Sequence, residues 1–180
     1  MISAQLKDLI LQSLTHERNS VHVYATALLC AIDEDLRIEW KIYHSQTQRH
    51  AAVLSGVCES LGLNTEDMTP ACRIVQYTDS ALFTAMNMAL AEGDAAAAEL
   101  VACECVMLAE TKDHADWELL GQCARALDGE AATVLTMAVN QIEGEKDEHL
   151  YHTQGWCREL WLRSLGLEAI LPPPEVRAAP

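Results

Sequence analysis

Residues 134–160 read VLTMAVNQIEGEKDEHLYHTQGWCREL and carry an apolar residue at about every third or fourth position. This spacing is typical of an amphipathic helix that turns one face toward a core. Ionisable side chains interrupt that face at mid-length. The inward line comprises Val134, Ala138, Ile142, Glu145, His149, His152, Trp156 and Leu160. Glu148 lies beside it. The stretch therefore predicts a long helix that carries carboxylate and imidazole groups into a protein core.

The rest of the chain also favours helix, because it has only 8 Gly and 5 Pro in 180 residues. Apolar periodicity predicts four long helices near residues 4–32, 35–62, 95–126 and 130–165. Short loops join the first two and the last two, so each pair should form an antiparallel hairpin. A further helical stretch over 70–90 lies in the long link between the hairpins. We expect an all-α four-helix bundle of residues 1–166 with one long helical crossover, and a Pro-rich, mobile tail over 167–180.

Composition excludes several classes of partner. The 12 Lys and Arg against 27 Asp and Glu give a net charge of −15, which should repel nucleic acid and anionic membrane surfaces. No apolar run of about 18 residues predicts a membrane span, and residues 1–10 do not resemble a secretory leader. The 7 cysteines, an odd number, cannot form a complete disulfide framework, so the sequence favours a reducing cytoplasm.

Each of the other long helices has polar residues at mid-length on its apolar line. Glu17 lies about as far from the first short loop as Thr47 and His50, and Glu110 about as far from the last loop as Glu145. Antiparallel partners at equal distance from a loop lie side by side, so these groups should meet at one level. His16, His22 and His44 lie off these lines, and we expect them at the surface or around the site.

Buried carboxylates and imidazoles need protons, ion pairs or a metal ion to offset the cost of desolvation. Oxygen and nitrogen donors of this kind suit Fe, Mn or Zn, and bundle cores bind two such ions with Glu and Glu/His pairs. Taken alone, His50 would more simply be a hydrogen-bonded core residue, and Glu145 and Glu148 part of a solvated, charged stretch. The predicted convergence of four helices favours a metal site.

These residues resemble the ferritin-like superfamily, and most closely its rubrerythrin-type branch, over residues 4–165. Glu145-Lys-Asp-Glu148-His149 is similar to the Glu-x-x-Glu-His motif that supplies di-iron ligands there. Glu17 and Tyr24 are similar to the first-helix ligand and the tyrosine that follows it. The chain departs from the family at Thr47, three residues before His50, where a Glu is expected; Gln46 is adjacent. It also departs in the third long helix, which has Glu110 and His114 where the family has glutamates. Glu104 is the alternative ligand candidate in that helix.

The resemblance implies a cofactor of two Fe ions or a mixed Fe/Mn pair, with Zn as a substitute, that reacts with dioxygen or peroxide. It implies that Glu17, Glu110 and Glu145 bridge or shift, that His50 and His149 each bind one metal, and that Tyr24 and Tyr43 donate hydrogen bonds nearby. Supporting roles would fall to Glu148, His114 and His152. Thr47 leaves open a site that holds one ion tightly and a second weakly.

The predicted function is therefore that of a metal-dependent oxidoreductase. We also expect a homo-oligomer, most simply a dimer, because Trp161 and Leu162 would leave apolar surface exposed on a single chain. The alternative is a non-catalytic, self-associating bundle whose polar cluster is an ion-pair network. A third interpretation takes Cys103 and Cys105, with nearby methionines, as soft ligands for Cu(I).

Overall fold

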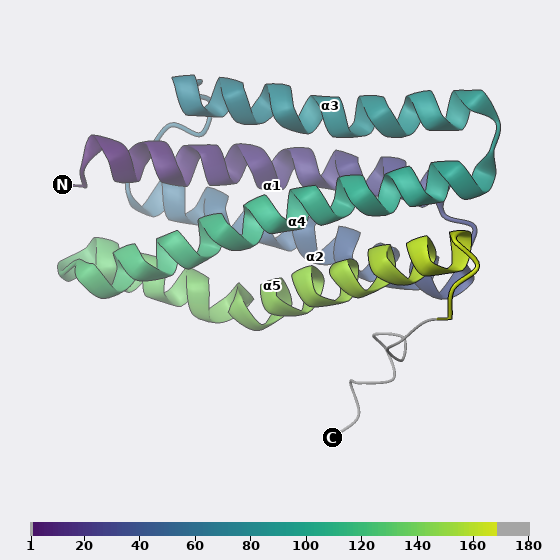
Figure 1. Cartoon of the computed structure of the whole chain (residues 1–180). Helices are drawn as coiled ribbons and strands as arrows, with labels where there is room; N and C mark the ends of the chain where they lie inside the picture. Colours follow the sequence, from purple (N-terminus) through teal and green to yellow (C-terminus); the bar gives the residue numbers. More distant parts are fainter. Residues whose placement is uncertain (1, 169–180) are drawn as a thin grey trace.

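The computed structural model describes residues 2–168, and within this range the chain forms five helices and no strand (Figure 1). They are α1 (Ala4–Cys30), α2 (Glu34–Ser60), α3 (Pro70–Glu92), α4 (Ala95–Ala126) and α5 (Gly129–Ser164). The all-α prediction is confirmed, and each helix begins and ends within two residues of its predicted bounds. Residues 169–180, most of the predicted tail, lie outside the described residues.

Local sequence signals explain where the helices begin and end. Ser3, Asp33, Thr69 and Asp94 precede four of the helices, and each side chain accepts a hydrogen bond from a backbone N–H of the first turn. Pro70 occupies the first turn of α3, where its missing N–H costs nothing. Gly93 ends α3 with a φ of 79°, a conformation that favours glycine, and so allows the short turn into α4.

The helices pack so that four of them surround a common core and α3 lies outside. α1 contacts α2 and α4, and α5 contacts α4 and α2, which leaves α1 and α5 on opposite corners. The crossover helix α3 packs against α1 and α4 (Figure 1). The short α1–α2 and α4–α5 connections thus form the two hairpins that the sequence predicts.

Two apolar clusters fill the core. The first, between the α1–α2 loop and mid-bundle, includes Trp40 and Trp156, and the second, toward the other end, includes Trp117. All three tryptophans are buried, as predicted. Buried polar residues of four helices, described below, lie between the two clusters along the helices.

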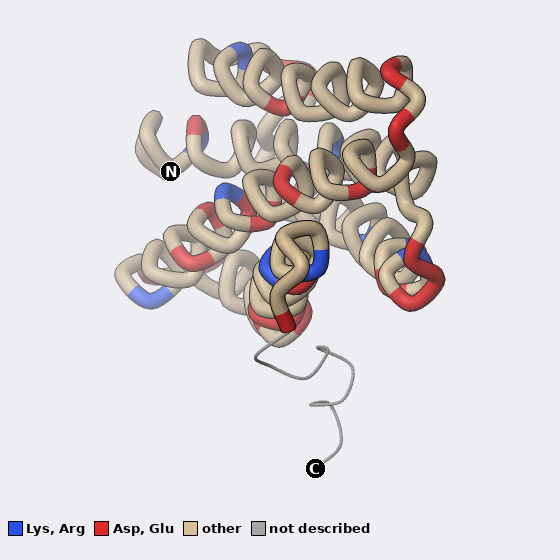
Figure 2. Tube along the Cα trace, turned by 45° about the vertical axis from the view of Figure 1, so that its right-hand side comes forward, with Lys and Arg blue, Asp and Glu red and all other residues tan. Residues whose placement is uncertain are grey.

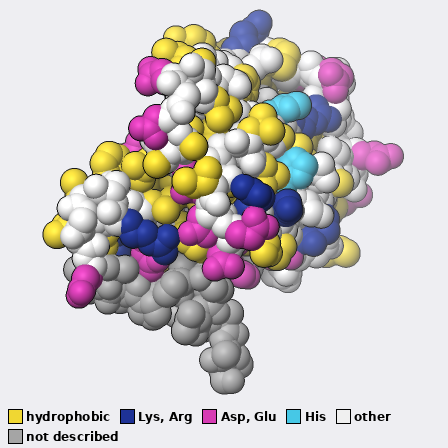
Figure 3. Space-filling model, turned by 90° about the vertical axis from the view of Figure 1, so that its right-hand side faces the viewer, with side chains coloured by type: hydrophobic (Ala, Val, Ile, Leu, Met, Phe, Trp, Pro, Cys, Tyr) yellow, Lys and Arg dark blue, Asp and Glu magenta, His cyan; other side chains and the backbone are white. Residues whose placement is uncertain are grey.

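The surface is strongly acidic, as composition requires. Asp and Glu are spread along the helices and outnumber Lys and Arg (Figure 2). At the end with the α1–α2 and α3–α4 loops, charged side chains lie among hydrophobic ones (Figure 3), and Arg163 binds Asp33 at 3.0 Å. Within residues 2–168, no helix has both the length and the apolar character that crossing a membrane requires.

Candidate functional site

A cluster of ionisable residues lies buried at the centre of the bundle. We call it the central cluster, and it comprises Glu17 of α1, His50 of α2, Glu110 and Asp113 of α4, and Lys146 and His149 of α5. All six are at most 1% exposed. The predicted convergence of Glu17, His50 and Glu110 is therefore observed, whereas α5 contributes Lys146 and His149 in place of Glu145, the residue expected opposite Glu110.

Lys146 lies between the carboxylates of the central cluster. Its Nζ binds Asp113 directly and lies 3.6 Å from Glu17 Oε1 and 3.6 Å from Glu110 Oε2. The last two distances are too long for hydrogen bonds, so one ammonium serves three carboxyl groups and satisfies only one of them well. The cluster is thus rich in negative charge even with its lysine.

The two imidazoles are held from outside and turn their other nitrogen inward. His50 Nε2 lies 2.8 Å from Glu145 Oε2, and His149 Nε2 lies 2.8 Å from Gln46 Oε1. His50 Nδ1 lies 3.7 Å from Glu17, and His149 Nδ1 lies 3.4 Å from Glu110. An outer partner that fixes one ring nitrogen while the other is free is the usual arrangement around metal-binding histidines.

Several inward atoms of the central cluster have no hydrogen-bond partner. They are Glu17 Oε2, His50 Nδ1, Glu110 Oε2, Asp113 Oδ1 and His149 Nδ1, together with the adjacent Thr47 Oγ1. Buried polar atoms are nearly always partnered in folded proteins, and each missing partner costs about 1–3 kcal/mol. These inward atoms at one level leave the cluster with unused hydrogen-bonding and ligand capacity.

Two aromatic residues fix the remaining carboxylate oxygens. Tyr24 donates from its hydroxyl to Glu110 Oε1 at 2.7 Å, as predicted, and Trp117 donates from Nε1 to Glu17 Oε1 at 2.7 Å. Tyr43 stacks against His149 with ring centroids 3.9 Å apart, and its hydroxyl donates to Glu39 at 2.6 Å. These contacts orient Glu17, Glu110 and His149 before any ligand arrives.

Burial and neighbouring charges shift the protonation of the cluster. Burial alone would raise the pKa of Glu110, but the charge of Lys146 and the proximity of His149 outweigh it and hold that pKa well below 4.5. Burial, reinforced by Lys146, lowers the pKa of His50 to about 4. At neutral pH, Glu110 is therefore an anion and His50 a neutral imidazole, the forms in which these side chains bind metals.

The other predicted site residues lie around the central cluster. Glu145 is partly exposed and binds Arg49 and His50, and Glu148 is exposed. His114 pairs with Asp147 at 2.9 Å on the outside of α4 and α5. His152 lies 2.7 Å from Glu39 and 2.9 Å from the Tyr43 hydroxyl. Of these four residues, Glu145 is the one that hydrogen-bonds a member of the central cluster, His50.

Sequence reasoning missed Lys146 and Asp113. The inward line of the last helix was placed through Glu145, whereas the buried residue is Lys146, one position later. The 3.6-residue helical period contained the signal, because Lys146 follows buried Val139 and Ile142 by seven and four residues. Lysine is seldom fully buried, so the residue type argued against a core position for Lys146.

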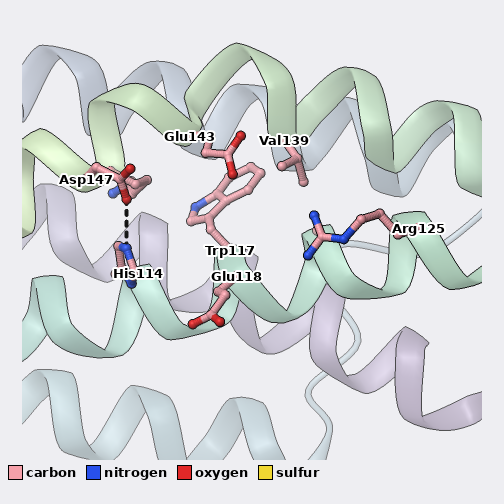
Figure 4. Close-up of a pocket in the computed structure, with 9 residues that line it drawn as sticks. His114, Trp117, Glu118, Arg125, Val139, Glu143 and Asp147 are labelled. Atoms are coloured by element: carbon pink, nitrogen blue, oxygen red, sulfur yellow. Dashed lines mark hydrogen bonds and ion pairs between the residues drawn. The ribbon is translucent and has the colours of Figure 1, made fainter.

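A small pocket between α4 and α5 reaches the edge of the central cluster (Figure 4). Its volume is about 150 Å³, and its lining includes Trp117 and Lys146, which both contact the cluster carboxylates. Trp117 extends from α4 toward α5 beside Glu143, and His114 and Asp147 pair at one side (Figure 4). The pocket brings solvent near the cluster from this side and has room only for a small molecule.

A second buried polar cluster lies between α1, α3 and α4. His16 Nδ1 lies 3.0 Å from Asp79 Oδ2, and its Nε2 lies 2.9 Å from the Ala109 carbonyl oxygen. Asn19 donates to the same Asp79 oxygen at 3.0 Å. His16 is fully buried, so its predicted position off the core was wrong, because α3 covers this face of α1.

The central cluster carries donor atoms of the kinds that transition-metal ions bind, but it lacks the carboxylates of a two-metal core. Free carboxylate oxygens and inward imidazole nitrogens suit Fe, Mn or Zn. The two positions that precede His50 and His149 by three residues hold Thr47 and Lys146 instead of carboxylates. Within residues 2–168, no three Cys, His, Asp or Glu side chains are arranged as a group that could hold a metal ion.

The cysteines are free thiols throughout the described residues. Cys103 and Cys105 are buried, and burial raises the pKa of both, in Cys105 to about 11. Thiols of this kind behave as small core residues rather than as reactive groups.

Comparisons with known proteins identified no protein similar to this chain. No protein-family model, no curated protein and no solved structure matches it.

Proposed function

We propose that this protein is a ferritin-like bundle that binds one divalent transition-metal ion, Fe or Mn, in the central cluster and acts as an oxidoreductase on dioxygen or peroxide. The observation that supports the proposal is the set of unpartnered, inward atoms contributed by α1, α2, α4 and α5. Two hairpins joined by one long crossover support the ferritin-like part of the proposal, because one long crossover is expected of such a bundle.

Glu17, His50, Glu110 and His149 would hold the ion. A metal in this position would supply reversible electron transfer to a small oxidant. The protein contributes orientation and charge: Tyr24 and Trp117 fix the two carboxylates, and the outer partners Glu145 and Gln46 fix the imidazoles. The apolar clusters on either side limit water, which strengthens every charge interaction within.

Charge balance supports one ion. Three carboxyl groups and one ammonium leave two negative charges in the cluster when the imidazoles are neutral. A divalent cation neutralises them, and the buried cluster then carries no net charge. Without the ion, the imidazoles must take protons or water must enter, and desolvation opposes a proton on His50.

The metal content per chain tests the proposal. The protein is purified without chelators from cells grown with added iron and manganese, and metals are counted by mass spectrometry. We expect one ion per chain, and its loss in Glu110→Gln and His149→Ala with retained helical circular dichroism. Glu130→Gln and His22→Ala are matched controls, because both residues are exposed. A metal-free wild type would contradict the proposal, and a loaded protein that consumes neither dioxygen nor peroxide would contradict the oxidoreductase part.

Lys146 favours a second candidate, a metal-free bundle that uses the cluster as an ion-pair network and associates through apolar surface. A buried lysine already supplies one cation to Glu17, Glu110 and Asp113. Ile38, Ile42 and Trp161 are exposed, which offers surface for a second copy. This candidate predicts a colourless dimer in sedimentation experiments whose melting temperature does not respond to metal or chelator.

A further inference from the structure

The positions of Thr47 and Lys146 distinguish this bundle from one that holds two ions. A two-metal bundle core uses two single glutamates and two Glu-x-x-His pairs, each pair on its own helix. Glu17 and Glu110 match the single glutamates, and His50 and His149 match the two histidines. The carboxylate partner three residues before each histidine is absent from both helices, although Thr47 and Lys146 are as deeply buried as a ligand would be.

The lysine amine lies in the region that a second cation would share. Its Nζ is equidistant, at 3.6 Å, from carboxylate oxygens of α1 and α4, Glu17 Oε1 and Glu110 Oε2. Its direct contact with Asp113 holds it there. An ammonium in this position attracts the same oxygens as a metal ion would and repels any other cation nearby, strongly so where the dielectric constant is low.

We infer that Lys146 is a fixed, genetically encoded cation that takes the place of one of two metal ions and limits the site to a single ion. The inference rests on the proposed function and deepens it. With the ammonium present, one divalent ion neutralises the three carboxyl groups, whereas two would leave a buried excess of positive charge. Thr47, whose hydroxyl is buried without a partner, completes the change because it offers no charge to a second ion.

The double variant Thr47→Glu/Lys146→Glu tests the inference directly. It restores both Glu-x-x-His pairs, so we expect two Mn²⁺ or Zn²⁺ ions per chain against one in the wild type, counted after equilibrium dialysis by mass spectrometry. The control, Lys41→Glu, repeats the charge change of Lys146→Glu at an exposed position of α2 and should keep one ion. One ion in the double variant, or two in the wild type, overturns the inference and leaves metal binding intact. No ion in the wild type overturns the proposed function and the inference with it.

A second variant keeps the inference testable if the double variant does not fold. Lys146→Met removes the ammonium and adds no carboxylate, so the first ion no longer competes with a cation. We expect its Mn²⁺ affinity, measured by competition with a coloured chelator, to be at least about tenfold tighter than that of the wild type. Lys41→Met should leave the affinity unchanged. An unchanged affinity in Lys146→Met would show that the ammonium does not compete, and would overturn the inference.

Discussion

His16 and Glu17 are neighbours in α1, yet they belong to two buried polar clusters of opposite character. His16 meets Asp79 and the Ala109 carbonyl, and none of the buried side-chain atoms of this pair lacks a partner. Glu17 belongs to the central cluster, where the inward atoms of several residues are unpartnered. A closed network of this kind stabilises the fold, whereas an open one has capacity for a ligand.

The elements that meet at each cluster explain the difference. The His16 cluster joins the crossover helix α3 to the bundle, so complete pairing there fixes α3 against α1 and α4. The central cluster joins α1, α2, α4 and α5, which also pack through two large apolar clusters. Because those helices are already fixed by apolar packing, the central cluster need not satisfy all of its own polar groups.

The largest effect on stability should follow from removing the lysine cation of the central cluster. We expect Lys146→Met, in the presence of chelator, to lower the free energy of unfolding by about 3–5 kcal/mol, because it leaves buried carboxylates without their ammonium. The measurement is urea denaturation followed by circular dichroism. Lys112→Met removes a lysine that binds Asp116 but is 38% exposed, and it should cost no more than about 1 kcal/mol. Equal losses in the two variants would show that the central cluster does not depend on Lys146.

Much of the fold and part of the central cluster could be predicted from the sequence, and the parts that could not have physical causes. The five helices followed from apolar periodicity and caps, and the meeting of Glu17 with His50 followed from loop distances. The same distances placed Glu145 opposite Glu110, where the structure has Lys146 and His149. On the predicted inward line of α5, Ala138, Ile142, His149, Trp156 and Leu160 are buried. Glu145 and His152 are one residue early, because each residue turns the helix by about 100° and Lys146 and Thr153 are the buried residues at those levels.

The partner of His16 could not be predicted for a different reason. Asp79 lies 63 residues away on α3, and sequence periodicity reports which face of a helix is buried, not which helix covers it. His16 lies off the line of α1 that faces the four-helix core and is buried by α3 instead. Long-range pairing of this kind requires the packing of α3, which the local pattern of α1 does not contain.

The contribution of the His16–Asp79 pair to the free energy of unfolding should depend on pH. Burial alone would lower the pKa of His16, but its bonds to Asp79 and the charge of that carboxylate outweigh burial and raise the pKa above 6.5. A raised folded-state pKa stabilises the fold fully below pH 6.5 and less as the pH rises through the raised value. We expect Asp79→Asn to cost about 1.5–3 kcal/mol at pH 6 and less at pH 8.5.

Urea denaturation of wild type and Asp79→Asn at the two pH values measures this difference. The control is Asp67→Asn, an identical change at a carboxylate that pairs with Lys7 at 2.8 Å on the surface. Its cost should be small and should not depend on pH between 6 and 8.5. A pH-independent loss in Asp79→Asn would mean that His16 stays neutral and that its contribution is only a neutral hydrogen bond.

The smallest effect should come from His114, which distinguishes the central cluster from its surroundings. His114 pairs with Asp147, whose side chain is 69% exposed, and such pairs contribute little because water competes for both partners. His114→Ala should therefore change the free energy of unfolding by less than about 0.5 kcal/mol and leave the metal content unchanged. His149→Ala, an identical change at a buried position of α5, should abolish metal binding. If His114→Ala also loses the metal, the ligands extend from the central cluster into the pocket between α4 and α5, and the boundary drawn between the unpartnered inward atoms and the paired outer residues is wrong.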